Sequence, residues 1–177
     1  MSINKIINFI AFQIIWLIAV IGAANELIWP TIIAAGLFCV WQLSPKRRHE
    51  NDLRLVIFAI ITGLILDSIW QASGLIEYQL SLPFIAPIWI LSLWVCLALG
   101  INHSLAWLKK SLWLPILFGA IGAPLSYLAG NRLGALSYPD GLLIINILLS
   151  ISWAAVMCGF TQFDRLFTKL SSNKNEY

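Results

Sequence analysis

The sequence predicts an all-α integral membrane protein, a six-transmembrane-helix bundle with the N-terminus and the C-terminus in the cytoplasm. Three observations predict this class. Of the 177 residues, 60% are hydrophobic and 11% are charged, against about 25% charged residues in soluble globular domains. The apolar residues fall into runs close to the roughly 20 residues that a helix needs to cross a bilayer. The basic residues gather on one side of these runs.

Six apolar runs occupy most of the chain. Since backbone polar groups inside lipid must be paired within their own segment, each run is expected to form a helix. The runs cover residues 6–24, 27–43, 54–73, 84–107, 111–130 and 142–162. They predict one six-helix transmembrane domain over residues 1–170, followed by a disordered cytoplasmic tail at residues 171–177.

The order of the runs predicts how the helices connect. Only the few residues around Asn25 separate the first two runs, so they should form a tight hairpin whose second helix begins at Trp29-Pro30. The fifth run contains Pro124 among several glycines, which predicts a kinked or broken helix. Beyond Phe160, apolar residues continue at helical spacing, which predicts an extension of the sixth helix along the membrane surface.

The first run also allows a second interpretation. Lys5, the apolar stretch after it and the small residues at 22–24 have the order of a cleavable signal peptide. Asn8, Gln13 and Trp16 interrupt that stretch, and in a permanent span their polar groups would form interhelical hydrogen bonds. We therefore interpret the run as the first transmembrane helix, paired with the second.

The distribution of Lys and Arg orients the bundle. All of the 11 basic residues except Arg132 lie at the N-terminus, in the second and fourth connections or near the C-terminus. Because basic residues beside membrane spans are retained in the cytoplasm, these segments are predicted to be cytoplasmic. The basic side chains expected to contact lipid headgroups or a partner protein are Lys46, Arg47, Arg48, Lys109 and Lys110.

Asp67 is the most informative polar residue. Its distance from Arg54 along a helix is roughly 20 Å, which places it in the outer half of the third run. A carboxylate at that depth is costly unless it is paired, hydrated or protonated, and it marks a functional site by default. We predict that Arg132 pairs with it. The candidate polar site consists of Asp67, Gln71, Tyr127, Asn131, Arg132 and Asn146.

The fifth run has two interpretations that the sequence leaves open. Its small residues, among them Gly119 and Gly122, would let a neighbouring helix approach closely. Alternatively, the carbonyl groups freed by Pro124 would line a water-filled pocket.

No catalytic residue, metal site or cofactor is predicted. The sequence lacks a GxSxG elbow, an HExxH motif and a glycine-rich phosphate loop. Cys39, Cys96 and Cys158 lie in separate apolar runs without metal-ligand spacing, so we interpret them as buried free thiols. The basic residues are explained by membrane orientation, so no nucleic-acid partner is expected. The oligomeric state is left open.

Several short stretches resemble a known family. They are residues 8–16, Leu66-Asp67-Ser68, residues 86–89, residues 102–105 and the motif GAxxxPLSYLAGxRLGA over residues 119–135. Together they resemble an uncharacterised bacterial inner-membrane family, a domain of unknown function, across nearly the whole chain. Ala123 stands where that family more often has a second glycine. The resemblance implies a Gram-negative inner membrane and an association with enzymes that modify membrane fatty acids, such as cyclopropane-type synthases.

Three classes of function follow. The first is a non-catalytic or accessory protein whose partners are membrane lipids and a lipid-modifying enzyme, as the missing motifs and the resemblance suggest. The second is a small transporter or channel that uses Asp67 as its ion or proton site. The third, an intramembrane lipid enzyme that uses Asp67 and His103, is the least supported because the two residues are expected near opposite faces of the membrane.

Overall fold

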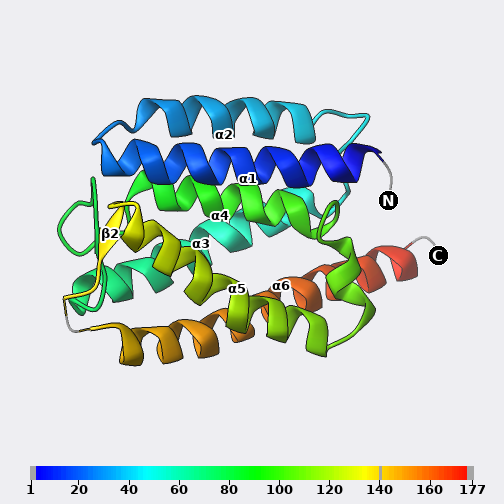
Figure 1. Ribbon diagram of the computed structural model, residues 1–177. Coiled ribbons are helices and arrows are strands. Elements are labelled where there is room, and N and C mark those ends of the chain that lie inside the picture. Colours follow the sequence, from blue (N-terminus) through cyan, green and yellow to red (C-terminus); the bar gives the residue numbers. More distant parts are fainter. Residues whose placement is uncertain (1–2, 140, 175–177) are drawn as a thin grey trace.

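Six α-helices packed in three neighbouring pairs form the structure, a computed structural model that describes residues 3–139 and 141–174. The helices are α1 (Ile3–Ala24), α2 (Trp29–Gln42), α3 (Asp52–Ala72), α4 (Ile88–Ile101), α5 (Trp113–Arg132) and α6 (Leu142–Lys174). The short 3₁₀ helix η1 (Ala106–Lys110) links α4 to α5, and β1 (Glu77–Tyr78) pairs antiparallel with β2 (Leu136–Ser137). The pairs α1–α2, α3–α4 and α5–α6 lie side by side (Figure 1).

The two ends of the bundle differ. We call the end that carries β1 and β2 the sheet end, and the end where α1 begins and α6 ends the tail end (Figure 1). The loop between α2 and α3 and the helix η1 also lie at the tail end. The segments that hold ten of the 11 basic residues are therefore gathered at one end of the molecule, while Arg132 lies at the other.

The length and composition of four helices are characteristic of a membrane protein. The helices α1, α3, α5 and α6 are long and apolar enough to cross a membrane. Large apolar side chains point outward, and Val40 and Leu143 are each 76% exposed. Such an apolar exterior suits lipid rather than water.

Two of the six expected spans are shorter than the apolar runs suggest. The helices α2 and α4 have 14 residues each, or about 21 Å at 1.5 Å per residue, against a bilayer core of about 30 Å. The run at 84–107 contains more than a helix, because residues 84–87 form a loop and residues 106–110 form η1. The helical class of the prediction is thus confirmed, and four helices have the length of full spans.

The helix α4 lies at the centre of the bundle. It contacts α1, α2, α3 and α6, and its buried residues lie all around its circumference. Trp94 on α4 packs directly onto Gly63 of α3, where an added Cβ atom would lie 2.5 Å from the indole ring. The absent side chain at Gly63 therefore allows Trp94 to reach the interior.

Small residues bring α5 against α6. An added Cβ atom at Gly119 would lie 2.2 Å from the backbone oxygen of Trp153 on α6. At Gly122, by contrast, nothing lies within 4 Å of the added atom, so this side of α5 is open. The close packing expected of the small residues is confirmed on one face of α5, while the other face borders open space.

Two expectations need correction, namely a break in α5 and disorder after residue 170. Of the kink or break expected at Pro124, the break is wrong, because Pro124 lies inside the continuous helix α5. A proline removes only one backbone hydrogen bond, and packing on α6 supports the helix. The expected helical extension beyond Phe160 is confirmed. It continues to Lys174, through residues 171–174 where disorder was expected, and the remaining residues of that tail lie outside the described part of the chain.

Candidate functional site

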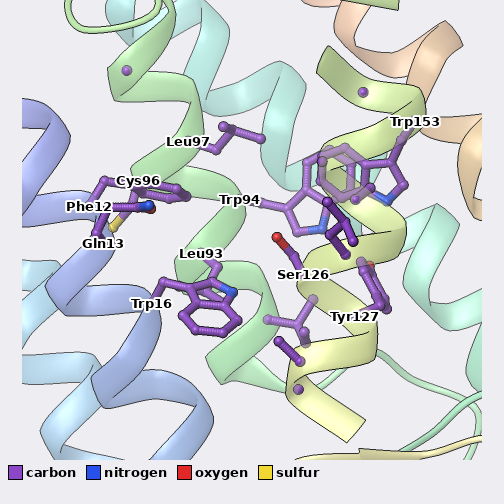
Figure 2. Close-up of a pocket in the computed structure, with 18 of the residues that line it drawn as sticks. Phe12, Gln13, Trp16, Leu93, Trp94, Cys96, Leu97, Ser126, Tyr127 and Trp153 are labelled. Carbon is purple, nitrogen blue, oxygen red and sulfur yellow. The ribbon is translucent and has the colours of Figure 1, made fainter. Parts of the chain in front are cut away.

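A groove opens on the side of the bundle between α1 and α5, with α4 as its floor. Its volume is about 490 Å³, within the range of roughly 300–1,000 Å³ that is typical of small-molecule sites. We call it the lateral groove. Figure 2 shows Phe12, Gln13 and Trp16 on one wall and Ser126 and Tyr127 on the other.

Aromatic side chains make up a large part of the lining, and no charged side chain among the described residues contributes to it. The eight aromatic residues are Phe9, Phe12, Trp16, Trp89, Trp94, Phe118, Tyr127 and Trp153. Trp94 and Trp153 stack with ring centroids 4.5 Å apart, and Trp153 meets Tyr127 edge-on at 6.3 Å. Gln13 and Ser126 bring exposed polar groups into this apolar setting. The groove therefore suits an apolar ligand with a small number of polar atoms.

Asp67 lies directly behind the wall of the groove. Its side chain is fully buried. The Tyr78 and Tyr127 hydroxyls donate to Oδ1 at 2.6 and 2.5 Å, and Trp94 Nε1 donates to Oδ2 at 2.6 Å. We call these four residues the Asp67 cage. The cage therefore offers Asp67 one indole and two phenol groups that can all donate, which is enough to solvate the carboxylate without a cation.

Helices from three parts of the chain supply this cage. The carboxylate comes from α3, the indole from α4 and one phenol from α5, while the other phenol comes from β1. The Tyr78 backbone N–H donates to Gln71 Oε1 at 3.0 Å, and Asn131 Nδ2 donates to the Leu136 carbonyl at 3.0 Å. These two amide side chains hold β1 and β2 in place, so they support the cage without contacting Asp67.

A second cluster of polar groups closes the tail end. Asp52, fully buried at the start of α3, accepts from Asn102 Nδ2 at 3.0 Å and lies 2.8 Å from His103 Nε2. With that nitrogen donating to Asp52, the other ring nitrogen accepts from the Gln42 amide, 3.3 Å away. Gln42 also accepts from Asn8 Nδ2 at 2.8 Å. The cluster thereby joins α1, α2, α3 and the end of α4.

The same cluster extends to α6. Lys109 Nζ donates to Asn102 Oδ1 at 2.7 Å and to Asp164 Oδ2 at 2.9 Å. Asn51 Nδ2 donates to Asp164 Oδ1 at 3.1 Å. We call this set the tail-end network, and its members are Asn8, Gln42, Asn51, Asp52, Asn102, His103, Ser104, Lys109 and Asp164. Its connections across five helices give it a clear structural role.

The tail-end network contains a serine, a histidine and an aspartate, but not in a catalytic arrangement. Ser104 Oγ donates to Asn8 Oδ1 at 2.6 Å. An amide oxygen is not a base, so the Ser104 hydroxyl is not activated here as a nucleophile. Asp67 is also remote from this end of the molecule, because the 15 residues from Asp52 along α3 correspond to about 22 Å.

Comparison with known proteins gives one match. Residues 5–159 match the family described as Protein of unknown function (DUF2878). This chain belongs to that family. The matched residues include the whole lining of the lateral groove and the Asp67 cage, so both features of this DUF2878 chain lie in the family region. No curated protein and no solved structure matches the sequence.

The structure brings together some of the residues expected at the polar site of this DUF2878 chain and separates others. Asp67 and Tyr127 are in direct contact, and Gln71 and Asn131 support the neighbouring strands. Asn146 Nδ2 instead donates to the Leu142 carbonyl of its own helix at 2.7 Å. Sequence reasoning missed Tyr78 and Trp94, because a tyrosine in a loop and a tryptophan in an apolar run have no distinguishing pattern.

The expected ion pair between Asp67 and Arg132 is wrong. Arg132 is exposed at the end of α5, and in the described part of the chain the ion pairs are His103–Asp52 and Lys109–Asp164. Neutral donors satisfy Asp67 without the cost of removing a guanidinium from water, which explains why Arg132 is left at the surface.

The basic residues expected to bind headgroups also divide into two groups. Lys46, Arg48 and Lys110 are exposed. Arg47 lies over the Trp41 ring at 4.9 Å and remains exposed. Lys109, in contrast, is engaged by Asp164 and Asn102 inside the tail-end network. Of the expected headgroup residues, Lys109 is therefore the one whose charge is already compensated.

Proposed function

We propose that this protein is a non-catalytic membrane protein that holds the apolar chain of a bilayer amphiphile in the lateral groove. One observation carries this proposal: an apolar groove of about 490 Å³ lies on the side of helices that have the length and composition of membrane spans. Its apolar walls match an acyl chain, and Gln13 and Ser126 provide hydrogen-bonding groups for polar atoms of the occupant.

The proposed setting is a bacterial inner membrane, with the tail end in the cytoplasm and six membrane crossings. The segments rich in Lys and Arg all lie at the tail end, which supports this orientation. Exposed Lys46, Arg48 and Lys110 would then face anionic headgroups or a lipid-modifying enzyme, at about 1 kcal/mol per well-placed charge.

The transporter hypothesis has less support. An ion-coupling carboxylate must exchange ions or protons with water, whereas Asp67 is fully buried and takes three short hydrogen bonds. Transport through Asp67 would require the cage to open.

Filling the groove tests the proposal. Gly122 lines the groove and has open space where a side chain would begin, so Gly122→Leu should fold and occupy the ligand volume. The probe is 9,10-dibromo-octadecanol, whose bromine atoms quench tryptophan fluorescence, added to the purified full chain in detergent. We expect saturable quenching of the wild type and about tenfold weaker binding to Gly122→Leu, the effect of losing roughly 1.4 kcal/mol of apolar contact.

The matched control is Gly36→Leu on α2, where an added Cβ atom also meets nothing within 4 Å and which lies outside the groove. It should bind the probe like the wild type. Quenching that does not saturate in the wild type, or equal binding to all three proteins, would contradict the proposal.

A further inference from the structure

We infer that the occupant of the lateral groove is an organic cation, an amphiphile whose ammonium group lies near the Asp67 cage. This inference rests on the proposed function and names the chemical class of the ligand. It depends on the charge behind the groove wall, the aromatic faces in front of that charge and the absence of charged residues from the lining.

The first step concerns charge. Asp67 is enclosed by neutral groups, and no ion pair involving it exists among residues 3–139 and 141–174. A buried carboxylate without a cation creates a negative potential that low dielectric surroundings screen weakly. The groove is the adjacent open space, because Trp94 and Tyr127 contact Asp67 and also line the groove. A cation entering the groove would therefore compensate Asp67.

The second step concerns the aromatic faces. A cation is attracted to the face of an aromatic ring, and such contacts strengthen when water is excluded. Trp94 and Tyr127 donate their hydrogen bonds to a carboxylate, which increases the electron density of both rings. Trp153 stacks on Trp94, and Trp16 lies on the opposite wall of the groove, on α1 (Figure 2). Aromatic side chains on both walls of the groove are the kind of lining that attracts quaternary ammonium groups.

The third step concerns specificity. An anionic ligand would meet the unfavourable potential of Asp67, and within the part of the chain that the structure describes no lysine, arginine or histidine lines the groove to offset it. The apolar walls on α1 and α5 can accommodate the chain of the same molecule. An aminolipid and a free lipophilic cation share this chemistry.

Two probes with the same chain distinguish this inference from the proposed function. One is 9,10-dibromo-octadecanol, and the other is the same brominated chain with a trimethylammonium end group. Binding to the purified full chain is measured by saturable quenching of tryptophan fluorescence. We expect the ammonium probe to bind the wild type about tenfold more tightly, as a desolvated cation–π site allows. Equal affinities would overturn the inference and leave chain binding intact. Failure of both probes to bind would refute the proposed function as well.

Variants test whether the charge of Asp67 causes the preference for the ammonium probe. Asp67→Asn should reduce the preference for the ammonium probe below about threefold, less than 1 kcal/mol, with little change for the alcohol. Glu26→Gln removes an exposed carboxylate at the same end of the bundle, outside the groove, and should retain the preference. Loss of the preference in Glu26→Gln but not in Asp67→Asn would overturn the inference.

Trp16→Leu provides a test that does not depend on the folding of Asp67→Asn. Trp16 lines the groove but does not contact Asp67. Its replacement should weaken the ammonium probe severalfold while the alcohol retains its affinity, and an equal loss for both probes would count against a cation–π site. Competition with tetramethylammonium then distinguishes a free cation from an aminolipid as the ligand. Displacement of the ammonium probe indicates that a free cation is sufficient, and failure to displace it indicates that the chain of an aminolipid is required.

Discussion

At the residue scale, Tyr127 and Asp67 make the shortest contact of the cage, and removing one hydroxyl tests its strength. Tyr127→Phe keeps the ring and leaves Oδ1 of Asp67 with Tyr78 as its remaining donor. Hydrogen bonds to charged groups contribute about 1.5–3 kcal/mol, so we expect the free energy of unfolding to fall by about that amount. Unfolding in mixed micelles of dodecyl sulfate and a non-ionic detergent measures it.

Tyr138 provides the matched control for this prediction. Its hydroxyl is buried and has no hydrogen-bond partner among residues 3–139 and 141–174, so Tyr138→Phe removes the same atom without removing a described hydrogen bond. We expect an unchanged or slightly increased stability, because an unsatisfied polar group is costly to bury. Equal losses in the two variants would show that the hydroxyl of Tyr127 contributes nothing specific.

A second residue-scale prediction concerns Gly63. Gly63→Ala places a methyl group against the Trp94 ring, which must move away from Asp67. We expect a loss of about 1–3 kcal/mol from overpacking, together with a change in near-ultraviolet circular dichroism from the displaced indole. Gly36→Ala, which meets nothing within 4 Å, should be neutral or stabilising by up to about 1 kcal/mol. A Gly63 variant as stable as the Gly36 variant would contradict this account.

The sequence revealed Asp67 because an isolated acid inside an apolar run is conspicuous. It did not reveal Trp94 or Tyr78, since a tryptophan in an apolar helix and a tyrosine in a loop have no pattern of their own. Their role depends on two tertiary contacts, the approach of α4 to Gly63 and the pairing of β1 with β2. Arg132 was the expected partner because opposite charges commonly pair. In the structure, neutral donors satisfy Asp67 instead.

At the element scale, the tail-end network joins α6 to η1 through Lys109 and Asp164. The Asp164 side chain is 4% exposed and that of Lys109 is 23% exposed. Asp164→Leu leaves Lys109 without its anion and should lower the free energy of unfolding by about 2–3 kcal/mol, less than the roughly 3–5 kcal/mol for fully buried pairs because water reaches Lys109.

The double variant Lys109→Met with Asp164→Leu is the control for this prediction. It removes both charges, and apolar replacements of a partly buried pair are often tolerated. We therefore expect the double variant to be more stable than Asp164→Leu alone, in the same micelle assay. Additive losses would indicate that the two side chains are not coupled.

Helix type and order could be predicted from apolar runs, but helix ends could not. The run at 84–107 looks continuous because its loop residues are as apolar as its helix. Ser68 Oγ accepts the Ala86 backbone N–H at 3.0 Å and holds residues before α4 in the loop. The tail-end network was missed for a similar reason. Asp52 begins α3 and Asp164 lies just beyond the apolar run 142–162, where sequence alone suggests solvation, and only packing buries them.

At the scale of the whole molecule, the arrangement of the six helices predicts the sidedness of the loops. Cysteines introduced at Glu77 and at Arg48, in a chain without its three native cysteines, should react from opposite sides of the membrane with an impermeant maleimide. Arg48 should be labelled only after the membrane is permeabilised. Labelling of both positions in intact spheroplasts would contradict the crossing of the membrane by α3, the helix that separates them.

The shortness of α2 has a consequence for the surrounding lipid. Its outer face is apolar, with Leu37 and Val40 strongly exposed, yet its length falls about 9 Å short of the bilayer core. Lipids beside α2 must shorten to cover this face, whereas those beside α6 keep their full length. Such a hydrophobic mismatch on one flank compresses the membrane unevenly. We therefore expect the protein to partition into thinner bilayers and to concentrate beside other proteins that thin the membrane in the same way.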